Sequence, residues 1–108
     1  MTSSRLESLK KFLAEEPNEV FTRYAIALEY ASLHNLSEAI AQLEEVIAFD
    51  SNYVPAYQRL GNYLQQIGRI DEAVTILKNG IKIAGAVGNT HAQNEMQDTL
   101  DELEDAGR

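Results

Sequence analysis

The 108-residue chain contains no cysteine and no tryptophan, and it has only two prolines. Without cysteine it can form neither a disulfide nor a thiolate metal site. It also lacks a run of roughly 20 apolar residues, which is the length that a helix needs to cross a bilayer. The first residues contain no apolar segment of signal-peptide length. These absences predict a soluble protein that stays in the cytoplasm.

Positive charge is scarce as well. Nine lysines and arginines stand against 17 aspartates and glutamates, so the net charge is −8. Nucleic acids and anionic membranes bind cationic faces, and we therefore expect neither as a partner. The acid is concentrated near the C-terminus, where only Arg108 opposes Glu95, Asp98, Asp101, Glu102, Glu104 and Asp105. A solvated surface is the simpler interpretation of this segment, and a docking face for a basic partner is the alternative.

What the chain does contain is the same helical pattern twice, 34 residues apart. Val20 recurs as Val54 and Leu43 recurs as Leu77, and apolar character is kept between these identities. Each copy has the periodicity of two amphipathic helices. A period of about 34 residues made of two helices is typical of a repeat array, in which each hairpin buries its apolar face on its neighbour.

The pattern predicts about six helices and no strand, over approximately 4–15, 18–33, 37–49, 53–67, 71 to the glycines at 80–88, and 90–105. The N-terminal capping residues that we expect are Ser4, Ser37, Asp71 and Thr90. Asn35 and Gly68 are expected to take the left-handed backbone conformation that ends a helix. The aromatic residues that we assign to the core are Phe12, Tyr30, Phe49 and Tyr57.

The residues within each copy resemble the tetratricopeptide repeat. The second copy fits the pattern of that family with Tyr57-x-x-Leu60-Gly61-x-x-Leu64 followed by Ala73-x-x-x-Leu77. The first copy fits it with Arg23-x-x-Ile26-Ala27-x-x-Tyr30 and Ala39-x-x-x-Leu43, although Arg23 replaces the usual large apolar residue. Residues 5–85 carry the resemblance.

The resemblance implies an all-α fold, a right-handed superhelical array of antiparallel helix pairs forming one domain over residues 1–108. We divide it into a half-repeat helix at 4–16, repeats at 20–52 and 54–86, and a capping helix at 89–105. Carrying the 34-residue period forward puts polar side chains where a further repeat would be buried, namely His91, Asn94, Glu95 and Asp98. A single apolar stripe of Ala92, Met96, Leu100 and Leu103 can instead cover the end of the array.

The family's ligands bind a concave groove lined by the first helix of each hairpin. The resemblance places a peptide-binding groove at Phe21, Tyr24, Leu28, Gln58, Arg59, Asn62 and Gln65, with Ala31 and Pro55 in the remaining places. Such a groove is apolar at one end and rich in amides at the other. That combination suits an extended peptide or an amphipathic helix.

The expected function is therefore protein–protein interaction, in which this groove binds a peptide segment or helix of a partner protein. The alternative is structural self-association, in which two copies pack their grooves together as a homodimer. A third arrangement has the last helix filling the groove. The clamp that some family members use for acidic chaperone tails is not expected, because its places hold Tyr24, Leu28, Arg59, Asn89 and Gln93, with one cation among them.

No constellation of residues predicts an enzyme, a cofactor or a metal site. Neither His34 nor His91 has a nucleophile at a readable spacing. His91, Glu95 and Asp98 share one helical face, but one histidine with two carboxylates on an exposed face is usually solvated. We assign no catalytic, cofactor-binding or metal-binding residue.

Overall fold

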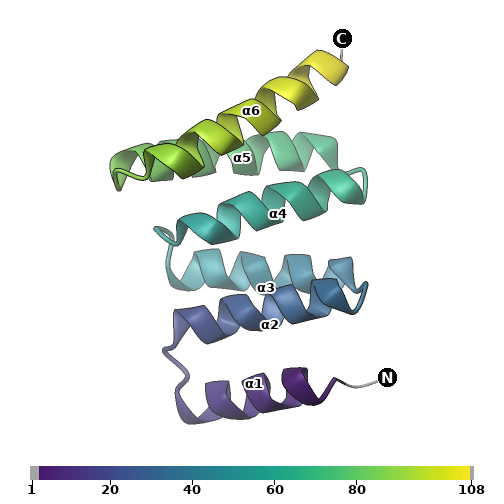
Figure 1. Cartoon of the computed structure of the whole chain (residues 1–108), viewed down its shortest axis with the longest axis vertical. Coiled ribbons are helices and arrows are strands. Elements are labelled where there is room, and N and C mark those ends of the chain that lie inside the picture. Colours follow the sequence, from purple (N-terminus) through teal and green to yellow (C-terminus); the bar gives the residue numbers. More distant parts are fainter. Residues whose placement is uncertain (1–2, 108) are drawn as a thin grey trace.

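The computed structural model describes residues 3–107, so Met1, Thr2 and Arg108 lie outside the described part of the chain. It contains α1 (Ser4–Glu15), α2 (Val20–Ser32), α3 (Leu36–Phe49), α4 (Val54–Gln66), α5 (Ile70–Ala86) and α6 (Thr90–Ala106). Successive helices run in opposite directions and stack along the long axis of a 44 × 31 × 19 Å molecule (Figure 1). Residues 3–107 contain no strand, and the predicted all-α array of helix pairs is confirmed.

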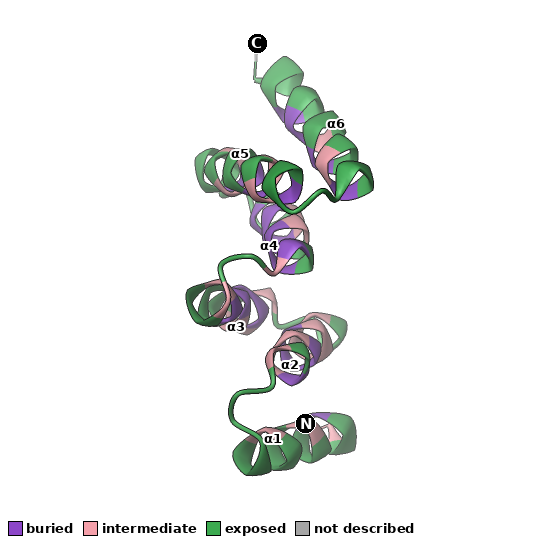
Figure 2. Cartoon of the chain, turned by 90° about the vertical axis from the view of Figure 1, so that its left-hand side faces the viewer, coloured by how far each residue is buried: buried purple, intermediate pink, exposed green. Residues whose placement is uncertain are grey.

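The helices form two rows. Helix α2 packs against α3, α4 packs against α5, and α6 packs against both α5 and α4. When the molecule is viewed from the side, α3 and α5 stand on one side of the stack while α2 and α6 stand on the other (Figure 2). The buried residues face the space between the rows. Residues of α2, α4 and α6 line one hollow, so these three helices share one face of the array.

One apolar core runs from α2 to α6, and small residues let its helices approach one another. Leu77 of α5 is 1% exposed, and a Cβ atom on Gly61 of α4 would lie 2.7 Å from its Cδ2 atom. In the same way, a Cβ atom on Gly80 would lie 2.6 Å from Sδ of Met96 in α6. The first hairpin has fully buried alanines, Ala27 and Ala39, on its two helices. The helix crossings thus lie at the small residues of the repeat pattern.

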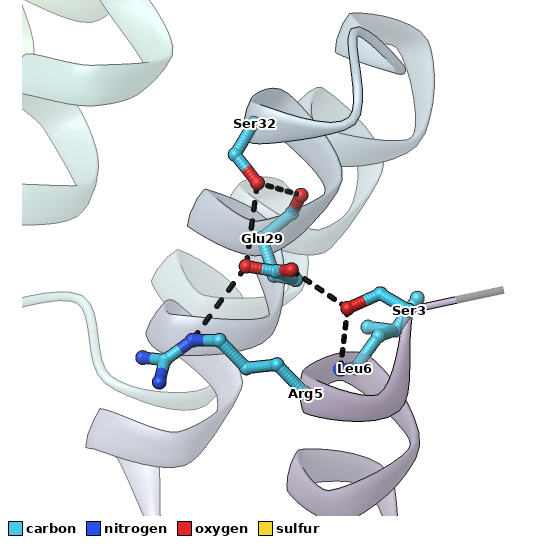
Figure 3. Close-up of polar contacts among 5 residues, drawn as sticks. All are labelled: Ser3, Arg5, Leu6, Glu29 and Ser32. Carbon is cyan, nitrogen blue, oxygen red and sulfur yellow. Dashed lines mark hydrogen bonds and ion pairs between the residues drawn. The ribbon is translucent and has the colours of Figure 1, made fainter.

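Helix α1 has one buried residue, Leu6, and a polar cluster also attaches it to α2. The carboxylate of Glu29 in α2 accepts hydrogen bonds from Ser3 Oγ at 2.8 Å and from Ser32 Oγ at 3.3 Å. It also forms an ion pair with Arg5 Nε at 3.5 Å (Figure 3). Ser3 Oγ in turn accepts from the backbone N–H of Leu6. Glu29 therefore joins the first turn of α1 to the last turn of α2.

The predicted capping residues are wrong by one or two positions. The observed caps of α1, α3 and α6 are Ser3, Asn35 and Asn89, each of which accepts from the backbone N–H three residues later. Helix α5 is preceded by Arg69, which makes no side-chain capping bond. The predicted caps Ser4, Ser37, Asp71 and Thr90 already lie inside the helices. Several residues suited to capping stand close together at these starts, and residue type alone does not choose between them.

The turn between the helices of each hairpin is made at equivalent positions. Gly68 has φ +83°, which confirms the prediction for that residue. In the first hairpin the left-handed residue is His34, with φ +63°, and not Asn35. Asn35 has φ −103° because it is the N-cap of α3.

Arg23, the departure from the family pattern, reproduces a contact of its counterpart Tyr57. Arg23 Nη2 donates to the carbonyl oxygen of Pro17 at 2.8 Å, and Tyr57 Oη donates to that of Ser51 at 2.7 Å. Both bonds reach back six residues. The guanidinium also lies over the ring of Phe49, 4.8 Å from its centroid.

The aromatic residues are less uniformly buried than predicted. Tyr57 is in the core and Tyr30 packs against it, as expected. Phe12 and Phe49 are 49% and 45% exposed, so their assignment to the core is wrong. Helix α1 has no preceding helix to cover Phe12 within the described residues. Phe49 is the last residue of α3 and is covered in part by Arg23.

Helix α6 covers the end of the array through the predicted stripe, since Ala92, Met96, Leu100 and Leu103 are all buried. Its register differs from the prediction, however. Helices α2 and α4 begin 34 residues apart, whereas α4 and α6 begin 36 residues apart. Helix α5 is three residues longer than α3, and the link after it is one residue shorter. The buried Ala92, Met96 and Leu100 accordingly take the places of Ala56, Leu60 and Leu64.

Candidate functional site

A hollow of about 390 Å³ lies where α2, α4 and α6 meet on their shared face. Its lining residues are Tyr24, Pro55, Gln58, Arg59, Asn62 and Glu95. We call the face around these six residues the concave groove. Four of the seven groove residues predicted from the sequence are among them.

The α2 side of the groove is a cluster of aromatic rings around one guanidinium. Arg59 Nε donates to Tyr24 Oη at 3.3 Å, and this bond holds the pKa of Arg59 above its usual value. The ring of Tyr24 packs against that of Tyr53, with centroids 5.3 Å apart. Burial raises the pKa of both Tyr53 and Tyr63. The positive charge of Arg59 therefore lies toward α2.

The floor of the groove is formed by amide side chains of α4. Gln58 Nε2 donates to Glu95 Oε1 at 3.2 Å, and Asn62 lies one helical turn further along. An amide side chain offers both a carbonyl acceptor and two N–H donors. These groups can therefore form hydrogen bonds with either polar group of a peptide backbone.

The α6 side of the groove carries Glu95, which the sequence analysis did not place there. Glu95 Oε1 accepts from Gln58 and lies 3.1 Å from His91 Nε2, and the side chain is half exposed. With the observed spacing of 36 residues, Glu95 and Asp98 take the places of Arg59 and Asn62. A strict 34-residue period does not place Glu95 in the groove. The glycines at 80, 85 and 88 are the feature of the sequence that indicates a change of period before the last helix.

The other predicted groove residues do not line the hollow. Phe21 stands at the start of α2 and is 65% exposed. Leu28 is half-buried against the core, and Gln65 is exposed near the end of α4. Helix α6 does not lie across the groove, because its apolar stripe packs on α5 and α4.

A second hollow of about 310 Å³ lies among α3, α4 and α5. Its lining residues are Glu44, Leu64, Asp71, Glu72, Thr75 and Ile76. Arg69 forms an ion pair with Glu72 beside it and holds the pKa of Glu72 below its usual value. This hollow contains no amide side chain that could bond a peptide backbone, so the concave groove is the better candidate site.

The described residues contain no group of three or more side chains arranged to hold a metal ion. His34 is exposed at its turn, and His91 pairs with Glu95 alone. Among residues 3–107, none of the helices is sufficiently long and apolar to pass through a bilayer.

Comparison with known proteins identifies the family. A family model described as tetratricopeptide repeat matches residues 54–86. The chain is 35% identical to a tetratricopeptide repeat domain protein from Salinibacter ruber, whose solution structure it matches with a TM-score of 0.78 over 82% of this chain and 89% of that one. It matches the TPR2B domain of yeast Sti1, solved as a complex with pHsp70, with a TM-score of 0.85 over 94% of this chain and 81% of that one; at 20% identity this shows the fold alone.

A longer relative is Protein DIA2 from Eremothecium gossypii, to which the chain is 33% identical over 99 residues. The match covers 86% of this chain but spans only 14% of the length of that protein. The helix pairs, the small residues at their crossings and the likeness to the Salinibacter ruber domain agree. The chain belongs to the tetratricopeptide repeat family, whose fold is that of a protein-interaction module.

Proposed function

We propose that this protein is a non-enzymatic interaction module that binds a peptide segment or helix of a partner protein in its concave groove. The observation that carries the proposal is the hollow itself, in which amide, guanidinium and phenol groups from α2 and α4 converge. Its neighbour in fold, the TPR2B domain of yeast Sti1, is known in a complex with pHsp70.

The groove offers hydrogen bonds in both directions to an extended chain. Gln58 and Asn62 can each donate and accept, and the N–H groups of Arg59 can donate to peptide carbonyls. Phe21 and Leu28, on α2 beyond the hollow, can receive an apolar side chain. Amide groups for the backbone and a pocket for a side chain are what peptide recognition requires.

We do not propose that the groove is the clamp that some family members use to bind acidic chaperone tails. With a spacing of 36 residues, the two clamp places first assigned to Asn89 and Gln93 fall on His91 and Glu95. A carboxylate then stands where an acidic tail would need a cation. A groove formed by three helices buries less surface than a standard protein–protein interface. We therefore expect a dissociation constant of roughly micromolar order.

The alternative is self-association, and the exposure of Phe21 favours it. An aromatic side chain that is 65% exposed at the apolar end of the groove could pack against a second copy. Light scattering over a range of protein concentrations distinguishes the two. A mass that stays at 12.0 kDa supports partner binding, and a mass that doubles supports the homodimer.

We also keep the division into a half repeat at 4–16, repeats at 20–52 and 54–86, and a cap at 89–105 as a proposal. A cytoplasmic location is proposed from the cysteine-free composition. Fluorescence microscopy of a tagged chain tests the location.

The groove is tested by affinity capture with two matched double variants. Arg59→Glu with Asn62→Ala changes the groove, and Lys78→Glu with Asn79→Ala makes the same kind of change on the exposed side of α5. We expect wild type and the α5 variant to retain the same partner and the groove variant to lose it. Retention by all three, with unchanged circular dichroism, would contradict the groove as the binding site.

A further inference from the structure

The concave groove changes character in steps from one end of the array to the other. Helix α2 contributes Tyr24 and, beyond the hollow, Leu28 and the exposed Phe21. Helix α4 contributes the amides and Arg59. Helix α6 contributes Glu95 to the hollow and has no lysine or arginine anywhere from Thr90 to Ala106. The face is thus apolar on α2 beyond the hollow, polar with one cation on α4, and acidic on α6.

Building on the proposed peptide-binding function, we propose that the groove selects an extended partner segment that is apolar at one end and carries lysine or arginine at the other. The basic side chain binds Glu95 in the hollow, with Asp98 beside it. The apolar side chain lies over α2, against Phe21 and Leu28. The partner is therefore a basic–apolar peptide rather than an acidic tail.

The carboxylate of Glu95 is placed to receive such a cation. Gln58 and His91 both contact its Oε1 atom. The side chain is 50% exposed, so a ligand can reach it. Asp98 is exposed and lies one turn further along α6. A charge-assisted bond at this position is stronger than a neutral one.

The positive charge within the groove does not oppose this arrangement. Arg59 is bonded to Tyr24 on the α2 side, whereas Gln58 of the same helix bonds to Glu95 on the α6 side. The hollow consequently has a cation toward α2 and an anion toward α6. A peptide segment that crosses the hollow has complementary charge when its own cation lies over α6.

The spacing between the two ends of the segment follows from the helix geometry. Helix α4 lies between α2 and α6, and because the axes of helices in direct contact are already about 8–10 Å apart, the two steps span at least roughly 16–20 Å. An extended chain rises about 3.3 Å per residue, so at least roughly six residues join the apolar and the basic side chains.

A second copy of this chain is a poor occupant of the acidic end. Two molecules that each carry a net charge of −8 repel one another, and the lysines and arginines of this chain are scattered over its helices. Charge complementarity favours a basic segment from another protein.

The test is selection from a phage-displayed library of random 12-residue peptides. The targets are wild type, Glu95→Lys with Asp98→Lys, and a matched control, Glu15→Lys with Glu16→Lys at the exposed end of α1, outside both hollows. Both double variants change the net charge equally. We expect wild type and the control to enrich peptides with Lys or Arg at least about six residues from an apolar residue, and the α6 variant to lose that preference.

The affinities of one enriched peptide make the comparison quantitative. We expect Glu95→Gln to weaken binding about two- to fivefold and Glu95→Lys to weaken it roughly tenfold or more. Binding to wild type should also weaken as salt is raised.

The outcomes separate this inference from the function on which it rests. Peptides that bind the groove but show no basic preference, or whose affinity is unchanged in Glu95→Lys, would overturn the charge selection alone. Enrichment of acidic peptides would also overturn it. Failure to enrich any peptide, or enrichment unaffected by Arg59→Glu with Asn62→Ala, would overturn the proposed groove function and this inference with it.

Discussion

At equivalent positions, the two repeats use different residues and reach the same local geometry. Arg23 and Tyr57 each bond the carbonyl oxygen six residues earlier. His34 and Gly68 each adopt a positive φ at the turn between the two helices of the hairpin. The first repeat therefore keeps the shape of the second while using residues that suit two of these places less well. Arginine must be partly desolvated there, and a side chain at positive φ is strained.

The strain at His34 predicts that His34→Gly stabilises the protein. Replacing a left-handed non-glycine residue with glycine should raise the free energy of unfolding by roughly 0.5–1 kcal/mol. Asn35→Gly is the matched control, because Asn35 has φ −103° and its side chain caps α3. That control should lower the free energy of unfolding by a few tenths of a kcal/mol, at about the level expected for a cap replaced by glycine. Urea unfolding measures both; stabilisation by Asn35→Gly alone would mean that the turn residue is misassigned.

The close contact at Gly61 predicts opposite effects for the same substitution at two glycines. Gly61→Ala puts a methyl group 2.7 Å from Cδ2 of the buried Leu77 and should cost roughly 1–3 kcal/mol. Gly85→Ala meets only the end of the flexible Gln93 side chain, so helix propensity should make it neutral or stabilising by up to about 1 kcal/mol. Thermal melting distinguishes them. Equal melting temperatures for the two variants would contradict the crossing at Gly61.

Among the elements, the two terminal helices, α1 and α6, pack against the array to different extents. Helix α6 buries four apolar residues, whereas α1 buries only Leu6 and is also joined to α2 by the Glu29 cluster. An element with few buried contacts opens more readily than the rest of a protein. Helix α1 should therefore be the least stable of the six helices.

The Glu29 cluster gives a specific prediction for α1. Glu29→Ala removes the acceptor of the Ser3 bond and the ion pair with Arg5, and it should weaken α1 docking by about 1–2 kcal/mol. Hydrogen exchange should speed up in α1 amides while α4 and α5 amides change little. Glu45→Ala, an exposed change on α3, is the control and should leave α1 exchange unaltered. Uniformly faster exchange in every helix of the Glu29 variant would show that α1 is not an independent unit.

Helix number and pairing could be predicted from the sequence because apolar periodicity repeats with an exact match at key positions. Val20 with Val54 and Leu43 with Leu77 fix the register of α2 to α5. The register of α6 could not be predicted, because it depends on how far α5 continues through Gly80 and Gly85 before Gly88 ends it. That two-residue change is why Glu95 was missing from the predicted groove. The capping errors have a different cause, since adjacent polar residues compete for one position.

Across the whole molecule, tyrosines that are buried or half-buried make the free energy of unfolding depend on pH in the alkaline range. Burial raises the pKa of Tyr53, Tyr57 and Tyr63 above the ordinary value of about 10. In the unfolded chain these phenols ionise near pH 10, while in the folded chain they keep their protons to higher pH. Their contribution to stability is complete below pH about 10 and is lost as the pH rises through their folded-state pKa.

Two measurements check this prediction. The free energy of unfolding in urea should fall from pH 9 to pH 11, and phenolate absorbance of the folded protein should show late titration for part of its five tyrosines. Tyr63→Phe should remove part of the pH dependence. Titration of all tyrosines together near pH 10 in a folded chain would contradict the burial of these rings.

The whole array also determines what the groove can bind, because its three walls come from three separate helices. Tyr24, Gln58 and Glu95 are brought together across residues 24–95 only when the hairpins stack in register. The binding surface is therefore a property of the folded array and not of any single repeat.

Amide chemical-shift mapping of the ¹⁵N-labelled chain, titrated with a peptide selected on it, tests this account most directly. We expect the largest shifts on the concave groove, at Tyr24, Gln58, Asn62 and Glu95, and little change in α3 and on the outer side of α5. Shifts centred instead on Glu44, Asp71 and Thr75, around the second hollow, would contradict it.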